Sequence, residues 1–204
     1  MNQSTGEAAL IAAAQRGDVH AFNRLVRSYQ RLAYNVAYRV LGDGESAADA
    51  TQDAFLSAFR AVGQFRGGSF KAWILRIVTN ECYDQLRRKQ RRPEDSLDDL
   101  AVEPDHSAML TDEHELPEDY ALRQELGEAI QKGLMTLPPD QRMVIVLADI
   151  QGYSYEEIAE MMGVAIGTVK SRLNRGRTRL RDLLLEQKEL LPAPYRLKVE
   201  EARL

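Results

Sequence analysis

The residues of this 204-residue chain with the clearest chemical potential lie in a basic segment near its C-terminal end. Between residues 165 and 181 the sequence contains six cationic side chains and no acidic one. The six are Lys170, Arg172, Arg175, Arg177, Arg179 and Arg181. Cations that neutralise phosphates release the counterions condensed on a nucleic acid. The segment therefore predicts that a helix brings six cations toward a polyanion.

Apolar and polar residues follow helical spacing in this segment. Small or apolar residues recur at steps of four, three and four, namely Val169, Leu173, Gly176 and Leu180. Polar residues lie on another side of the same helix, namely Lys170, Ser171, Asn174, Arg175 and Thr178. One face is thus expected to pack against the protein while the other contacts a ligand. A solvated basic face on a purely structural helix is the alternative.

The residues before this helix predict how it is positioned. Ser154-Tyr155-Glu156-Glu157 fits a capping box, in which Ser154 accepts a hydrogen bond from the Glu157 amide and the Glu157 carboxylate reaches back. A helix starts there and turns at Gly163-Val164 before the basic helix. Two short helices around a glycine-containing turn describe a helix-turn-helix, whose second helix enters the major groove of duplex DNA.

The sequence offers little for catalysis or metal binding. Cys82 is the single cysteine, and His20, His106 and His114 have no ligand spacing, so neither a disulfide within the chain nor a zinc site is expected. Cys82 fits a small buried side chain better than a nucleophile. We expect no enzyme, no cofactor and no metal. The sequence lacks a signal-peptide pattern and an apolar run of about 18 residues, which favours the cytoplasm.

Acidic residues are concentrated between two helical lobes. Residues 94–119 hold eleven Asp and Glu and no Lys or Arg, so the rest of the chain carries a net charge of +7 although the total is −4. With Pro93, Pro104 and Pro117 and no sustained apolar period, this stretch predicts a flexible, self-repelling linker. We expect domains over residues 7–92 and 120–186, a linker over 93–119 and a C-terminal extension over 187–204.

Helical periodicity dominates both lobes and predicts an all-α fold with two small helical domains. In the first lobe it predicts helices over 7–15, 22–40, 46–62 and from 70 into the basic run at 87–92. Ser46 is the expected N-cap of the third of these, and Trp73 is assigned to packing. In the second lobe, Leu126, Ile130 and Leu134 fit one helix, and Pro138-Pro139 opens another that ends at Gly152.

Two further polar faces are predicted in the first lobe. Asp49, Gln52 and Asp53 lie at steps of three and four, where they can pair with basic groups of a partner. The alternative is an acidic first turn that complements the helix dipole. A second exposed face follows on the last helix, formed by Asn80, Asp84, Arg87 and Arg88.

Several motifs together point to a known family. In the second lobe they are Leu137-Pro138-Pro139-Asp140-Gln141-Arg142, Tyr153-Ser154-Tyr155-Glu156-Glu157-Ile158-Ala159 and Gly167-Thr168-Val169-Lys170-Ser171-Arg172. These resemble region 4 of bacterial sigma-70 family sigma factors. In the first lobe, Asp49 to Phe55 is similar to the region 2 segment that binds the clamp helices of RNA polymerase, and Trp73 to Arg88 resembles the promoter-reading helix. Because regions 1 and 3 are missing, the resemblance is to the extracytoplasmic-function (ECF) group.

The resemblance implies a region 2 bundle and a region 4 helix-turn-helix domain that bind core RNA polymerase and direct promoter-specific initiation. It assigns polymerase binding to Asp49, Gln52, Asp53, Leu56 and Arg60. It assigns the minus-ten element to Phe65, Arg66, Asn80, Asp84, Arg87 and Arg88. It assigns the minus-thirty-five element to Thr168, Lys170, Ser171, Asn174, Arg175 and Arg177. The implied partners are core polymerase, promoter DNA and an anti-sigma protein, with no membrane insertion and a monomer when free.

Two other functions fit parts of the sequence. A stand-alone helix-turn-helix regulator would bind its operator without polymerase and would use the first lobe to sense a ligand or to dimerise. An adaptor that holds RNA on its basic segments is a more distant alternative, because no aromatic RNA-binding sheet motif is present. Gel filtration of the chain alone and with core polymerase separates these alternatives.

Overall fold

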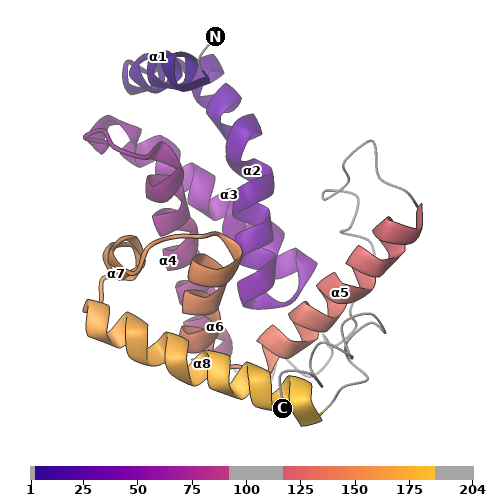
Figure 1. Ribbon diagram of the computed structural model, residues 1–204. Helices are drawn as coiled ribbons and strands as arrows, with labels where there is room; N and C mark the ends of the chain where they lie inside the picture. Colours follow the sequence, from indigo (N-terminus) through magenta and orange to yellow (C-terminus); the bar gives the residue numbers. More distant parts are fainter. Residues whose placement is uncertain (1–2, 92–116, 187–204) are drawn as a thin grey trace. The chain divides into compact units, whose positions relative to one another are not determined.

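The computed structural model describes residues 3–91 and 117–186, and over these ranges it contains helices and no strand (Figure 1). The first range contains α1 (Gln3–Gln15), α2 (Val19–Leu41), α3 (Gly44–Ala61), the 3₁₀ turn η1 (Val62–Gln64) and α4 (Phe70–Arg91). The second contains α5 (Pro117–Met135), α6 (Pro139–Ile145), the π-helical turn η4 (Val146–Ile150), α7 (Tyr155–Met162) and α8 (Ile166–Glu186). The predicted all-α fold is confirmed.

The chain divides into two compact units. Helices α1 to α4 belong to the first unit, as do residues 160–163 at the end of α7, while α5, α6, η4, the start of α7 and α8 belong to the second. Helix α5 begins at Pro117, slightly before Tyr120, where the sequence predicts the second lobe to start. The rest of the predicted linker and the C-terminal extension lie outside the described residues.

Capping residues delimit α2. The Asp18 carboxylate accepts hydrogen bonds from the backbone amides of His20 at 2.8 Å and Ala21 at 3.0 Å. Gly42 ends the helix with a φ of +94°, a left-handed conformation that costs little only for glycine. The helix is therefore longer at its start than the apolar period predicts, because the cap and not the first apolar residue sets the boundary.

The N-cap of α3 is Asp43, and the prediction of Ser46 is wrong. Asp43 Oδ1 accepts a hydrogen bond from the Ser46 backbone amide at 2.7 Å, so Ser46 already lies in the first turn. Asp43 Oδ2 accepts from Lys89 Nζ at 3.0 Å, which ties the start of α3 to the end of α4. Burial alone would raise the pKa of Asp43, but the hydrogen bonds from Ser46 and Lys89 together lower it.

The first unit buries the apolar faces of its helices together. The predicted inward residues of α3 and η1 are all buried: Ala50, Ala54, Phe55, Ala58 and Val62. Phe70 and Ile74 contribute the buried face of α4, and Cys82 is fully buried on the same helix. The interpretation of Cys82 as a core residue is confirmed, and burial together with the charge of Glu81 raises the pKa of its thiol to about 12.

The second unit is built around α6, against which α8 packs. Leu134, Met143, Leu147 and Leu173 are fully or almost fully buried in it. The helix predicted to run from Pro139 to Gly152 is correct in extent but changes type, because α6 gives way after Ile145 to the π-helical turn η4. The Gln151 amide donates to the Val146 carbonyl at 3.0 Å, a five-residue step that closes this wider turn.

Candidate nucleic-acid interface

The predicted helix-turn-helix is present at α7 and α8, with local contacts at the start of α7 and at the turn that follows it. The Ser154 backbone amide donates to Glu157 Oε2 at 2.8 Å and the Glu157 amide donates to Ser154 Oγ at 3.2 Å, so the capping box is confirmed. Gly163 has a φ of +63°, and the Val164 amide donates to the Ala159 carbonyl at 3.0 Å. Unlike the two short helices of the prediction, α8 is long, with 21 residues.

Helix α8 has one packed and one exposed face. Val169 and Leu173 are buried, and Gly176 lies so close to α6 that an added Cβ would be 2.8 Å from Ile145 Cδ1. The predicted polar face is exposed at Lys170, Ser171, Asn174, Arg175 and Thr178, while Thr168 is half-buried. The predicted division of α8 into a buried face and an exposed polar face is therefore confirmed.

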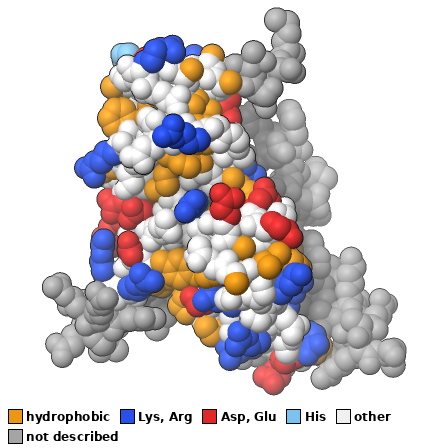
Figure 2. All heavy atoms as spheres, turned by 90° about the vertical axis from the view of Figure 1, so that its left-hand side faces the viewer, with side chains coloured by type: hydrophobic (Ala, Val, Ile, Leu, Met, Phe, Trp, Pro, Cys, Tyr) orange, Lys and Arg blue, Asp and Glu red, His pale blue; other side chains and the backbone are white. Residues whose placement is uncertain are grey.

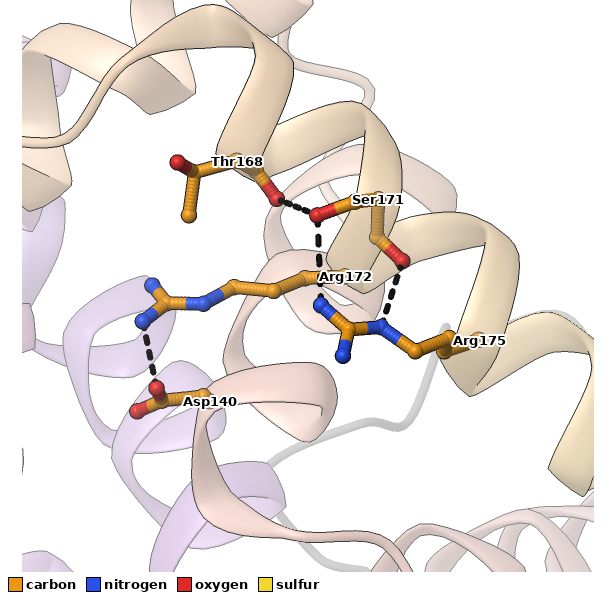
Figure 3. Close-up of polar contacts among 5 residues, drawn as sticks. All are labelled: Asp140, Thr168, Ser171, Arg172 and Arg175. Atoms are coloured by element: carbon orange, nitrogen blue, oxygen red, sulfur yellow. Dashed lines mark hydrogen bonds and ion pairs between the residues drawn. The ribbon is translucent and has the colours of Figure 1, made fainter.

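The arginines of α8 point in different directions. Arg172 turns toward α6, where its Nη2 lies 2.5 Å from Asp140 Oδ2 and its side chain is only 20% exposed (Figure 3). Arg175 folds back along its own helix and donates to Ser171, from Nε to the carbonyl at 3.2 Å and from Nη2 to Oγ at 3.3 Å (Figure 3). The expectation that all six cations face one ligand is wrong for Arg172, since it holds α8 to α6.

Three arginines further along α8 also have partners in the protein. Arg177 donates to the Asp149 carboxylate, Arg179 Nη1 donates to Gln141 Oε1 at 3.2 Å, and Arg181 pairs with its neighbour Asp182 at 2.8 Å. Hydrogen bonds with Asp149 raise the pKa of Arg177, against a smaller lowering by burial. Figure 2 shows cationic side chains interspersed with acidic and apolar ones on the face that it draws.

The residues predicted to bind polymerase share one exposed face of α3. Asp49, Gln52, Asp53, Leu56 and Arg60 are all exposed. Their side of the helix lies opposite the buried side and is open to a partner.

Sequence reasoning missed one member of the α3 face. Phe59 is 41% exposed and follows Leu56, itself 47% exposed, by one helical step. Its ring contacts that of Phe22 with 5.1 Å between centroids, so it is held in place while one side remains open to solvent. The three-residue spacing between Leu56 and Phe59 was the sequence signal that could have placed Phe59 on this face. An apolar pair flanked by Asp53 and Arg60 combines hydrophobic and charged contacts in one surface.

The loop before α4 is built on an aromatic cluster. The Phe65 ring contacts those of Phe70 and Trp73, with centroids 5.5 and 5.4 Å apart, and Phe70 and Trp73 contact each other at 5.3 Å. The assignment of Trp73 to packing is confirmed, and Phe65 is half-buried in the same cluster. Gln15 Nε2 donates to the Phe65 carbonyl at 2.8 Å, a support from α1 that sequence reasoning missed.

Exposed polar residues lie beside this cluster and along α4. Arg66 is exposed in the loop, and Asn80, Asp84, Arg87 and Arg88 are exposed on the helix. Arg87 Nη1 lies 3.8 Å from Asp84 Oδ1, with both side chains more than half exposed, so this pair is weak and open to exchange with a ligand. The predicted common face of the four α4 residues is thus solvent-accessible.

Other site classes find no support in the described parts of the chain. Residues 3–91 and 117–186 contain no group of three or more His, Cys, Asp or Glu side chains placed to hold a metal ion. Among the described helices, none combines the length and apolar character needed to cross a membrane.

Comparison with known proteins identifies both units. The family model for Sigma-70 region 2 matches residues 25–92, and that for Sigma-70, region 4 matches residues 127–180. The ECF RNA polymerase sigma factor SigM of Mycobacterium tuberculosis is 41% identical over 179 residues, which cover 87% of this chain and 84% of the relative. The ECF RNA polymerase sigma-E factor of Escherichia coli K12 is 37% identical over 179 residues, covering 87% and 93%.

Solved structures agree with these relatives. The sigma factor RpoE of Bartonella quintana, in complex with the anti-sigma factor NepR, matches with a TM-score of 0.62 and 31% identity over 81% of this chain and 98% of that one. CnrH in complex with the cytosolic domain of CnrY matches with a TM-score of 0.59 and 27% identity, over 88% and 97%.

Fold and matched regions together define a promoter-recognition subunit built from sigma regions 2 and 4. The chain belongs to the sigma-70 family, in its ECF group of RNA polymerase sigma factors. Such a factor directs transcription initiation and catalyses no reaction itself. A stand-alone helix-turn-helix regulator is not favoured, because it does not account for region 2.

Proposed function

We propose that this sigma factor divides promoter recognition between its units, with α8 reading duplex DNA at the minus-thirty-five element and the first unit holding the melted minus-ten element. The observation that carries the proposal is the exposed row of Lys170, Ser171, Asn174 and Arg175 opposite the buried side of α8. Side chains of these types form hydrogen bonds to base edges and phosphates in the major groove. Thr168 at the start of the helix completes this surface.

Binding to core polymerase is assigned to the α3 face of Asp49, Gln52, Asp53, Leu56 and Arg60. Exposure of Leu56 supports the assignment, because a large apolar side chain kept in solvent next to charged residues is typical of an interaction surface. The acidic first-turn explanation accounts for neither the position of Asp53 beyond the first turn nor the exposed apolar pair.

The minus-ten strand is assigned to Phe65 and Arg66 in the loop and to Asn80, Asp84, Arg87 and Arg88 on α4. A half-buried aromatic ring beside an exposed arginine suits stacking of an unpaired base with a cation near its phosphate. Because Phe65 also packs at steep angles against Phe70 and Trp73, its ring is held in place before a base binds.

An anti-sigma protein is the proposed regulatory partner, and the cytoplasm the proposed location. Two similar sigma factors were solved as complexes, one with the anti-sigma factor NepR and one with the cytosolic domain of CnrY. The apolar pair Leu56 and Phe59 offers a surface on which such a partner would compete with polymerase.

Polymerase binding is tested by co-elution of the full chain with core enzyme. Asp49→Lys combined with Asp53→Lys should abolish co-elution while the helical circular-dichroism signal is retained, because both side chains are exposed. Glu125→Lys with Glu128→Lys is the matched control, since it makes the same charge change at exposed positions of the other unit. Unchanged co-elution of the α3 variant would refute the assignment.

DNA recognition is tested by runoff transcription and permanganate footprinting on linear and pre-melted templates from a pooled promoter library. Lys170→Ala removes a proposed base contact, which should cost about 1–3 kcal/mol of binding free energy. A pre-melted template should not restore transcription by this variant. Arg66→Ala and Phe65→Ala should impair opening and recover in part on a bubble. Arg66→Ala is needed beside Phe65→Ala because the latter also opens the aromatic cluster. If all three variants fail at the same step, the division of roles is wrong.

A further inference from the structure

Arg177 is the α8 cation most completely engaged by another part of the protein. Its Nε donates to Asp149 Oδ2 at 3.0 Å and its Nη2 donates to Asp149 Oδ1 at 2.5 Å, so both carboxylate oxygens are used by one guanidinium edge. A two-point arrangement of this kind fixes direction as well as distance. Asp149 lies 28 positions earlier in the chain, so the pair joins separate elements.

The π-helical turn places Asp149 opposite α8. Asp149 belongs to η4, where the wider turn changes the angular position of its side chain from the one that a continued α6 would give. Arg177 also interacts favourably with Tyr155, the first residue of α7. The Arg177 side chain therefore joins α8 to the turn that precedes the helix-turn-helix.

Neighbouring contacts hold the same stretch of α8 against α6. Arg172 pairs with Asp140 on one side, and the close approach of Gly176 to Ile145 lies between the two arginines. Arg177 is half exposed and Asp149 about one-third exposed, so DNA phosphates could compete for this guanidinium if the carboxylate were absent.

We propose that Asp149 and Arg177 are positioning residues that fix α8 for DNA binding, and that Asp149 keeps Arg177 from serving as a phosphate contact. The inference rests on the proposed reading of duplex DNA by α8 and replaces the direct DNA contact that the sequence suggests for Arg177. Lys170, which is exposed and has no ion-pair partner among the described residues, keeps the role of a phosphate or base contact.

Salt dependence separates a phosphate contact from a positioning residue. Each phosphate neutralised on duplex DNA adds about 0.9 to the slope of log affinity against log salt concentration. The full chain is titrated with a labelled random-sequence duplex at several salt concentrations. Lys170→Ala should make the slope shallower by up to about 0.9, whereas Arg177→Ala should leave it unchanged. Asp149→Asn removes the competing charge and should steepen it by a similar amount.

Arg181→Ala is the matched control, because it removes an α8 cation that pairs only with its neighbour Asp182 in the described structure. A slope for Arg177→Ala as shallow as that for Lys170→Ala would overturn the proposal, as would an unchanged slope for Asp149→Asn. A purely structural role of the pair would not steepen the slope of the Asp149 variant.

A second measurement does not need DNA. Urea unfolding of the free chain is compared for Asp149→Ala, Arg177→Ala and the double variant. If the ion pair of Asp149 and Arg177 holds α8 in place, the second substitution lowers the free energy of unfolding much less once the first is present. Losses of unfolding free energy that simply add would refute this. If the wild-type chain bound no duplex and Lys170→Ala had no effect, the proposed reading of duplex DNA by α8 would fail. The unfolding comparison of the single and double variants would still decide whether Asp149 and Arg177 hold α8 in place.

Discussion

Gly176→Ala tests whether α8 is held against α6 as closely as the structure indicates. The new Cβ would lie 2.8 Å from Ile145 Cδ1, 3.3 Å from Gln141 Cβ and 3.4 Å from Ile145 Cγ1. Ile145 is 3% exposed, so its side chain has little space into which it can rotate. Gln141 Cβ is fixed by the helix backbone. The methyl group must therefore displace α8 or force Ile145 from its rotamer.

The expected magnitude is a balance of two opposing effects. Overpacking a close-packed site costs about 1–3 kcal/mol, whereas replacing glycine by alanine inside a helix gains about 1 kcal/mol. Gly176→Ala should thus lower the free energy of unfolding by about 0–2 kcal/mol. Gly133→Ala is the matched control on α5, because its Cβ would also meet an atom at 2.8 Å, here Leu180 Cδ1. That atom is the end of a half-buried, flexible side chain, so the helix gain should dominate.

Urea unfolding of the full chain, followed by circular dichroism, measures both variants. The control should be the more stable variant, by about 1–3 kcal/mol if its leucine moves aside freely. Gly176→Ala should also weaken duplex binding, because a shift of α8 displaces the face of Lys170 and Asn174. If Gly176→Ala proves as stable as Gly133→Ala or more so, the close contact with Ile145 does not restrain α8.

Other contacts give predictions of the same kind. Asp43→Ala should destabilise the chain by about 0.5–2 kcal/mol at neutral pH. The folded pKa of Asp43 is lowered, so its stabilisation is present above about pH 4 and is lost as the pH falls through the folded value. Urea unfolding should show that Asp43→Ala lowers the free energy of unfolding less near pH 3 than at pH 7. An equal loss of unfolding free energy at both pH values would contradict this prediction. Cys82 should resist a thiol-reactive disulfide reagent near pH 8 until the chain unfolds, since its pKa is raised to about 12 by burial; rapid labelling of the native chain would exclude this. Ser154→Ala should lower the free energy of unfolding by about 1 kcal/mol through loss of the capping box, whereas Ser28→Ala at an exposed position of α2 should cost much less in the same assay.

Local sequence signals predicted the helices well because each depends on residues close together in the chain. The capping box of Ser154 and Glu157 needs only a three-residue spacing, and the buried row of α3 needs only the helical period. Ser46 failed as a cap because a serine and an aspartate compete within four positions. Either can accept from a backbone amide, and the extended conformation at Asp43 decides between them.

Contacts between distant residues were beyond the same reasoning. The charge of Arg172 or Arg177 can be read from the sequence. The direction in which each side chain points depends on carboxylates about thirty positions away, which α6 and η4 bring into reach. The support of the Phe65 carbonyl by Gln15 likewise spans 50 positions. Sequence therefore predicted which side of α8 is polar and which cations exist, whereas the structure shows which of those cations the protein itself uses.

The pairing of α8 arginines with carboxylates bears on the proposed reading of duplex DNA by α8. Arg172 and Arg177 are paired with carboxylates of other elements, which reduces the number of α8 cations available for phosphates. Since affinity for any duplex grows with each phosphate neutralised, such a helix is expected to bind DNA less tightly than one whose six cations all face the duplex. When polymerase holds both units beside one promoter, each contact raises the effective concentration for the other, and two weak contacts become one strong and selective one. The proposed reading of duplex DNA by α8 therefore predicts that Asp140 and Asp149 lower the affinity of the free factor for unrelated DNA, while the exposed row of Lys170 and Asn174 stays available for the promoter.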